Sequence, residues 1–178
     1  MKAMYAGSFD PITNGHLDII KQAVGVFDHV VICVSTNPKK TGTQLFSPSE
    51  RVALILAALE KEIEPEWVCP TGHPASVHLR DHPISVYAGT AQLTVSTAEQ
   101  FNCSVLIRGL RAVSDFDLEF QMVQFNRKIK PGINTVFFMP DERYFYLSSS
   151  AVREIHSMGG DVSEFVPACV ATAMAKLS

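Results

Sequence analysis

A strand, a turn and a helix follow one another at the start of this chain, and this succession constrains the fold more than any other feature. The apolar residues 3–6 lead directly into Gly7-Ser8-Phe9-Asp10-Pro11-Ile12-Thr13-Asn14-Gly15-His16. A glycine at the end of a strand lets the backbone approach a ligand closely, and an Asp-Pro pair favours a turn. We expect Asn14 to cap the helix that follows, whose apolar residues share one face: Leu17, Ile20, Val24 and Phe27.

The turn before this helix predicts a nucleotide site. The first turn of a helix carries unpaired N–H groups and the positive end of the helix dipole, and both favour a phosphate. His16 lies in that first turn, where its imidazole can add a donor to the same anion. A lone Gly-x-x-His would indicate only a buried, hydrogen-bonded histidine, because short motifs often occur by chance. The ten-residue string from Gly7 to His16 is far more specific.

Length and charge limit the class of protein. The chain has 178 residues, of which 47% are hydrophobic, and this suits one domain with a sizeable core. A net charge of −3 provides no broad basic surface, so we expect neither a nucleic-acid nor a membrane partner. Every apolar stretch is far shorter than the roughly 20 residues that span a bilayer.

Cysteine usage favours a reducing environment. The four cysteines are widely spaced and form no Cys-x-x-Cys pair, and the N-terminus shows no charged-then-apolar leader. We therefore expect a cytoplasmic protein. The cysteines in question are Cys33, Cys69, Cys103 and Cys169.

Strand-like and helix-like segments alternate along the whole chain. Residues 30–35 form a continuous apolar run rich in β-branched side chains, which is typical of a parallel strand buried on both faces. Ser47-Pro48-Ser49-Glu50 is a capping box that begins a helix over 51–60. Further strands are expected at 84–87, 105–107 and 134–139, and further helices at 94–101, 115–128, 149–157 and 167–177. This order predicts an α/β fold: one Rossmann-like domain over 1–178, with a doubly wound sheet of five parallel strands.

Residues 63–83 interrupt the alternation. The segment carries four prolines and three histidines, and we interpret it as a surface loop insertion. The histidine spacing matches no zinc motif, and no cysteine or acidic partner lies in register, so we assign no metal ligands. These residues are Pro65, Pro70, Pro74, Pro83, His73, His78 and His82.

Three further motifs agree with the first one. They are Asn37-Pro38-Lys39-Lys40, Leu106-Ile107-Arg108-Gly109-Leu110-Arg111-Ala112-Val113-Ser114-Asp115-Phe116, and Leu147-Ser148-Ser149-Ser150-Ala151-Val152-Arg153. With these segments the chain closely resembles the bacterial phosphopantetheine adenylyltransferases of the nucleotidyltransferase superfamily. The resemblance implies transfer of AMP from ATP to 4′-phosphopantetheine, which gives dephospho-coenzyme A and pyrophosphate in coenzyme A biosynthesis. It also implies Mg²⁺ with ATP, a homohexamer, and coenzyme A as a feedback ligand.

The resemblance also implies roles for individual residues. His16, Lys40 and Arg111 would be catalytic, with His16 stabilising the transition state at the α-phosphate. Ser8, Lys40, Thr94 and Arg108 would bind phosphopantetheine, with Ser8 orienting its phosphate. The implied ATP contacts are Ser8, Phe9, His16, Gly109, Leu110, Arg111, Glu119, Tyr144, Phe145, Tyr146, Leu147, Ser148, Ser149 and Ser150.

Several of these assignments have plain structural alternatives. Lys39 can replace Lys40 as the substrate lysine, because the loop before Phe46 is longer than the family pattern. The two arginines can pair with Asp115 or Asp117 on the surface, although such pairs usually contribute little stability. Glu119 can be an ordinary helix-face charge, and serine runs are often plain N-caps.

Two other functions compete with the transferase hypothesis. Nicotinate-mononucleotide adenylyltransferases and cytidylyltransferases usually have histidine where Thr13 stands, so Thr13 disfavours them. A non-catalytic nucleotide-binding regulator could use the same fold, since fold does not fix function. His16 among several phosphate-binding positions disfavours this second alternative.

Overall fold

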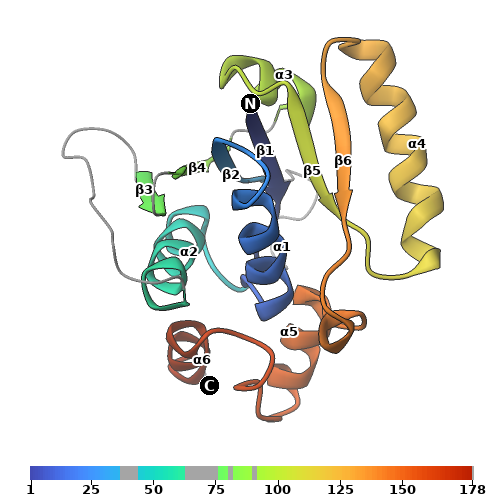
Figure 1. The fold of residues 1–178 in the computed structure, drawn as a ribbon. Helices are drawn as coiled ribbons and strands as arrows, with labels where there is room; N and C mark the ends of the chain where they lie inside the picture. The colour runs from blue at the N-terminus through green and yellow to red at the C-terminus, as the bar shows by residue number, and fades with distance from the viewer. Residues whose placement is uncertain (37–43, 63–75, 80–81, 90–91, 178) are drawn as a thin grey trace.

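A single α/β domain is built around a twisted, largely parallel sheet (Figure 1). The computed structural model describes residues 1–36, 44–62, 76–79, 82–89 and 92–177. The strands are β1 (Lys2–Gly7), β2 (His29–Val34), β3 (Ser76–Leu79), β4 (His82–Ala88), β5 (Val105–Gly109) and β6 (Asn134–Phe138). The helices are α1 (Asn14–Val24), α2 (Pro48–Glu62), α3 (Thr94–Gln100), α4 (Val113–Ile129), the 3₁₀ turn η2 (Glu142–Tyr144), α5 (Ser149–Ser157) and α6 (Ala168–Ala175).

The strand order shows at which point of the sheet a ligand can bind. The order is β3-β4-β2-β1-β5-β6, and β4, β2, β1, β5 and β6 run parallel to their neighbours within this set. The chain moves to one side of β1 through β2 and β4 and to the other side through β5 and β6, so the strand order reverses at β1. Ligands of doubly wound sheets bind beyond the carboxyl ends of the strands at such a switch point. The parallel pairing of β4, β2, β1, β5 and β6 confirms the predicted sheet of five parallel strands.

The central strand is buried on both faces. Ala3 and Tyr5 belong to one apolar cluster with α1 and α2, while Met4 and Ala6 belong to a second cluster with α3. Because side chains alternate along a strand, the run 3–6 supplies both clusters from consecutive residues. This double burial explains why β1 reads as a continuous apolar run.

The predicted loop insertion over 63–83 requires a correction. Residues 76–79 form β3, which pairs antiparallel with β4, and β4 begins at His82. Residues 76–79 and 82–83 therefore lie in two paired strands at the edge of the sheet and not in a loop. Pro83, opposite His78, precedes Ile84, where the pairing of β4 with β2 begins, so that pairing does not need an N–H from the proline. Residues 63–75 and 80–81, with Pro65, Pro70 and His73, lie outside the described residues.

The cap of α1 also differs from the expectation. Thr13, not Asn14, is the N-cap residue, and its backbone is extended with φ −121°. The Thr13 hydroxyl accepts from the His16 N–H, and the His16 ring accepts from the Thr13 N–H, so the two residues form a capping box. Asn14 is the first helical residue, and its side chain donates to the Glu164 carbonyl.

The lengths and hydropathy of the helices show whether any of them could span a membrane. In the part of the chain that the structure describes, none of the helices has both the length and the apolar character needed to cross a bilayer.

Candidate active site

Two neighbouring cavities open beyond the carboxyl ends of β1 and β5. The first, of about 260 Å³, lies over the start of α1 and reaches η2 and the start of α5. The second, of about 330 Å³, lies on the other side of the Ser8 segment and reaches α2. Both cavities share one wall, formed by Ala6, Gly7, Ser8, Arg108, Ser149 and Ser150.

The predicted site residues divide between these cavities. Thr94 and Arg108, predicted to bind phosphopantetheine, both line the second cavity. Among the predicted ATP contacts, the lining of the first cavity omits Leu110, Phe145 and Tyr146. It includes Ser8, Phe9, His16, Gly109, Arg111, Glu119, Tyr144, Leu147, Ser148, Ser149 and Ser150. Lys39 and Lys40 lie outside the described residues, so the choice between them stays a prediction.

His16 faces the first cavity as a neutral donor. Its Nδ1 lies 3.0 Å from the Thr13 backbone N and accepts that N–H, so the ring must keep a free lone pair there. The ring proton therefore belongs on Nε2, the nitrogen left for a ligand. Burial, and secondarily the charge of Arg111, lowers the pKa of His16 from 6.5 to about 4. His16 is thus uncharged near neutral pH.

The backbone before His16 is held in an uncommon conformation. Phe9 has φ 45°, in the left-handed region, and its buried ring packs edge-on against Tyr5 at 5.2 Å and His16 at 5.1 Å. A Cβ at Gly7 would lie 3.1 Å from the Phe9 ring, which is tighter than ordinary contact. Glycine at position 7 therefore lets the Phe9 ring fold back beneath the cavity.

Arg108 is fixed by a bidentate ion pair. Its Nη2 and Nε lie 2.5 and 2.8 Å from the two carboxylate oxygens of Glu119 on α4. Its Nη1 donates to the Ala6 carbonyl at the end of β1. Such a planar fork sets the direction of the guanidinium. Glu119 therefore orients Arg108, whichever ligand it also contacts.

Arg111 bridges α4 and the segment before α5. Its Nε lies 3.2 Å from Asp115, and its Nη1 donates to the Leu147 carbonyl at 2.8 Å. The surface-pair alternative thus holds for Arg111, yet the same side chain lines the first cavity. Arg108 instead takes Glu119 as its carboxylate partner.

The serines at the start of α5 make different contacts. Ser148 is the N-cap and accepts from the Ala151 N–H, which is the plain capping alternative. Ser149 donates to the Pro11 carbonyl at 2.8 Å and so ties α5 to the turn after β1. Ser149 and Ser150 lie at the helix N-terminus and line both cavities, where N–H groups favour phosphate.

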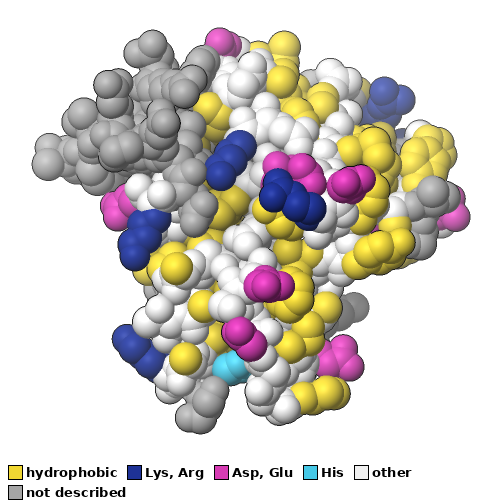
Figure 2. Space-filling view, turned by 60° about the horizontal axis from the view of Figure 1, so that its bottom comes forward, with side chains coloured by type: hydrophobic (Ala, Val, Ile, Leu, Met, Phe, Trp, Pro, Cys, Tyr) yellow, Lys and Arg dark blue, Asp and Glu magenta, His cyan; other side chains and the backbone are white. Residues whose placement is uncertain are grey.

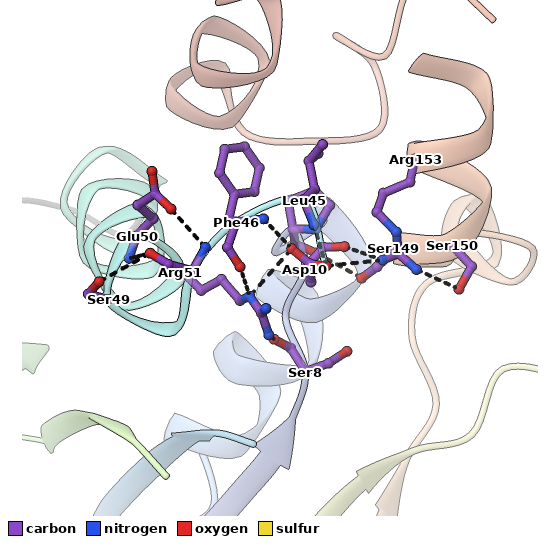
Figure 3. Close-up of polar contacts among 12 residues, drawn as sticks. Ser8, Asp10, Leu45, Phe46, Ser49, Glu50, Arg51, Ser149, Ser150 and Arg153 are labelled. Atoms are coloured by element: carbon purple, nitrogen blue, oxygen red, sulfur yellow. Dashed lines mark hydrogen bonds and ion pairs between the residues drawn. The ribbon is translucent and has the colours of Figure 1, made fainter. Parts of the chain in front are cut away.

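The buried carboxylate of Asp10, which the sequence indicates only as part of a turn, organises one side of the second cavity (Figure 3). Asp10 is 4% exposed, and its two oxygens accept from the backbone N–H groups of Leu45 and Phe46 at 3.0 and 2.9 Å. Arg51 on α2 and Arg153 on α5 lie on either side of it, 3.4 and 3.7 Å from its two oxygens. Three distant segments therefore meet at one side chain.

Arg51 extends this network to the shared wall. It is 1% exposed, and its Nε and Nη1 donate to the carbonyls of Phe46 and Ser8 at 2.7 and 3.2 Å. The sequence held a signal for it: Arg51 falls at helical spacing with Ile55 and Leu59, two fully buried residues of α2. An arginine in an apolar stripe predicts a buried acidic partner.

The described residues offer no protein cage for a metal ion. No group of three or more His, Cys, Asp or Glu side chains lies together in the parts of the chain that the structure describes. Three carboxylates next to the cavities, Asp10, Asp115 and Glu119, are in ion pairs with arginines.

Together these features define a nucleotidyltransferase of the Rossmann-like class, and comparison with known proteins agrees. The family model for cytidylyltransferase-like proteins matches residues 4–155. Among solved structures, a putative nicotinate-nucleotide adenylyltransferase from Vibrio parahaemolyticus aligns with TM-score 0.62 and 16% identity, covering 99% of this chain and 91% of that one. A nicotinic acid mononucleotide adenylyltransferase from Plasmodium falciparum aligns with TM-score 0.67 and 12% identity, covering 99% and 95%. At these identities the likeness supports the fold alone.

Sequence relatives narrow the class. A phosphopantetheine adenylyltransferase of Alkaliphilus metalliredigens is 43% identical over 175 residues, 98% of both chains. Enzymes of the same name from Methylacidiphilum infernorum and Hamiltonella defensa are 42% and 38% identical, covering 97% and 98% of this chain and 88% and 97% of theirs. This chain therefore belongs to the phosphopantetheine adenylyltransferase family.

Titration of His16 gives a test of its environment. Between pH 6.5 and about 4 the unfolded chain binds a proton at His16 that the folded chain does not, so stability falls as pH drops through this window. At about pH 5 the loss reaches at most about 2 kcal/mol, from about 1.36 kcal/mol per pKa unit. His16→Gln keeps an acceptor for the Thr13 N–H but cannot titrate there.

Urea denaturation of both proteins at about pH 7 and about pH 5 measures the difference. We expect the wild-type chain to lose more unfolding free energy than His16→Gln. Equal losses in the two proteins would contradict a depressed pKa at His16.

Proposed function

We propose that this chain transfers the adenylyl group of ATP to 4′-phosphopantetheine and releases dephospho-coenzyme A and pyrophosphate. The observation that carries the proposal is the pair of cavities with a common wall at Ser8, Arg108 and Ser149. Two polyanions held in adjoining cavities can meet only at that wall. Relatives at 38% to 43% identity that bear the name of this activity support the choice of substrates.

The reaction needs placement and charge stabilisation more than a protein nucleophile. An oxygen of the acceptor phosphate forms a bond to the α-phosphorus of ATP, while the bond from that phosphorus to the bridging oxygen breaks and pyrophosphate departs. Holding both groups in line removes most of the entropic cost of their encounter. Donors aimed at the α-phosphate then stabilise the charge that develops there.

Each donor has a place in this scheme. The neutral His16 imidazole donates its Nε2–H to the α-phosphate from the first cavity. Arg111 and the N-terminus of α5 offset the charge of the leaving pyrophosphate. The Ser8 hydroxyl, on the shared wall, orients the acceptor phosphate, and Arg108 binds the acceptor from its Glu119-fixed position.

We propose that Mg²⁺ accompanies ATP and is held mainly by its phosphate oxygens. Hard oxygen ligands from a substrate are the usual setting for this ion, which keeps several waters. The described residues do not provide a ligand set of their own. Coenzyme A shares the pantetheine and adenylate parts of the product, so it would occupy the same two cavities as a feedback ligand.

A cytoplasmic location is also part of the proposal. In the described part of the chain, the buried residues Cys33 and Cys103 are free thiols, which suits a reducing compartment.

Self-assembly is supported by α4, which stands beside β6 at one end of the sheet (Figure 1). Figure 2 shows hydrophobic side chains gathered on that side of the molecule. An apolar patch of this kind on a soluble fold marks an interaction surface. We take its occupant to be another copy of this chain, as in the homohexamer that the family resemblance implies. By the α4 face we mean the exposed apolar side chains around this helix, each at least 45% exposed: Phe116, Leu118, Phe120, Met122, Phe125 and Ile129.

Turnover tests the proposed reaction. With ATP, Mg²⁺ and 4′-phosphopantetheine, the wild-type chain should release pyrophosphate and form dephospho-coenzyme A. His16→Ala should lower kcat by about 100-fold or more while ATP still binds, because the imidazole acts on transition-state charge. A wild-type chain that turns over nicotinate mononucleotide but not phosphopantetheine would contradict the proposal. An unchanged kcat in folded His16→Ala would remove His16 from the mechanism.

Sedimentation velocity tests the α4 face. Phe125→Asp should shift the wild-type oligomer toward smaller species, because it places a charge within the apolar contact. Met158→Asp, at an exposed methionine after α5, is the matched control and should keep the wild-type mass. A single-chain mass for the wild type, or an unchanged mass in Phe125→Asp, would contradict self-assembly through this face.

A further inference from the structure

Charge is not balanced evenly along the second cavity. Four charged side chains line it within the described residues: Asp10, Arg51, Arg108 and Arg153. Glu119 neutralises Arg108 through two short contacts. The remaining three groups are two guanidiniums around one carboxylate, so they carry one net positive charge.

Of these two guanidiniums, Arg153 is the more accessible to a ligand. Arg51 is 1% exposed and is bonded to two backbone carbonyls beside Asp10, whereas the Arg153 side chain is 29% exposed. The ion pair of Arg153 is also long: its guanidinium donates to the Asp10 carbonyl, but its Nη1 lies 3.7 Å from the carboxylate atom Oδ2 of Asp10, and its Nη2 lies 3.4 Å from the Ser150 hydroxyl. A tightly committed arginine, such as Arg108, lies 2.5 to 2.8 Å from its carboxylate. Arg153 therefore keeps capacity to bind another anion.

The position of Arg153 places it in the second cavity, where we propose that the acceptor binds. Arg153 lies one helical turn after Ser149 on α5, and residues at this spacing share a face. Ser149 belongs to the shared wall, but Arg153 lines the second cavity only. Its guanidinium donates to the Asp10 carbonyl, which fixes its distance from the turn after β1.

We propose that Arg153 is a further substrate-binding residue, which binds the phosphate monoester of the acceptor in the second cavity and helps to select phosphorylated over unphosphorylated acceptors. The proposal rests on the proposed function of the two cavities. Arginine suits the task because its planar fork can keep its contact to the Asp10 carbonyl while it donates to phosphate oxygens.

Calorimetric titration with and without the phosphate group isolates this role. We compare 4′-phosphopantetheine with pantetheine as ligands of the wild-type chain, Arg153→Met and Arg153→Lys. Arg153→Met should weaken phosphopantetheine binding by about 10- to 100-fold, the range for a hydrogen bond to a charged group. The affinities for pantetheine and for ATP, measured in the same way, should change by less than about twofold. Arg153→Lys should fall between, because an ammonium keeps the charge but not the fork.

A matched control removes a different ion-paired cation. Lys130 lies 2.6 Å from Glu99, far from both cavities at the amino end of the sheet, and Lys130→Met should bind every ligand as the wild type does. Wild-type affinity for phosphopantetheine in Arg153→Met would overturn the proposal. So would equal losses for ATP, pantetheine and phosphopantetheine, which would mean that Arg153 only supports the fold around Asp10. A wild-type chain that binds no phosphopantetheine would contradict the proposed function itself, and with it the proposed role of Arg153.

Discussion

The buried carboxylate of Asp10 is the interaction on which the candidate site depends. Removing a carboxylate from water is costly unless it is paired and hydrogen-bonded, and Asp10 has both kinds of compensation. Two backbone N–H groups and two arginines surround it, and they come from the segment before α2, from α2 itself and from α5. Because the carboxylate cannot lose these partners cheaply, the three segments are held against the turn after β1.

The Asp10 network also shapes the cavities at the switch point of the sheet. Parallel strands alone would leave an open crevice beyond β1 and β5. The Asp10 network closes one side of the crevice through Arg51 and the Ser8 carbonyl, and the Arg108–Glu119 pair fixes the other side. The result is two cavities with a common wall, which is what transfer between two anionic substrates requires.

The sequence predicts the parts of this site that local chemistry determines. Gly7 and His16 could be placed because a strand, a turn and an amphipathic helix follow one another within a short stretch. The N-cap is Thr13, one residue before the expected Asn14, since both residue types are good caps and only the contacts of the His16 ring decide between them. The sequence does not indicate the strand β3, because the prolines and histidines around it in 63–83 are typical of a loop, whereas pairing with β4 makes it a strand. Asp10 could not be assigned its role, since its partners lie 35 to 143 residues away.

The position of the two substrates relative to the shared wall tests this account most directly. A crystal structure with 4′-phosphopantetheine and a non-hydrolysable ATP analogue would measure the distance from an acceptor phosphate oxygen to the α-phosphorus. We predict about 3 to 3.5 Å, a reactive approach, with the two atoms meeting beside Ser8 and Ser149 and the His16 Nε2 within hydrogen-bonding distance of the α-phosphate. A nucleotide phosphate in the second cavity, or an acceptor phosphate remote from Ser8, would contradict it.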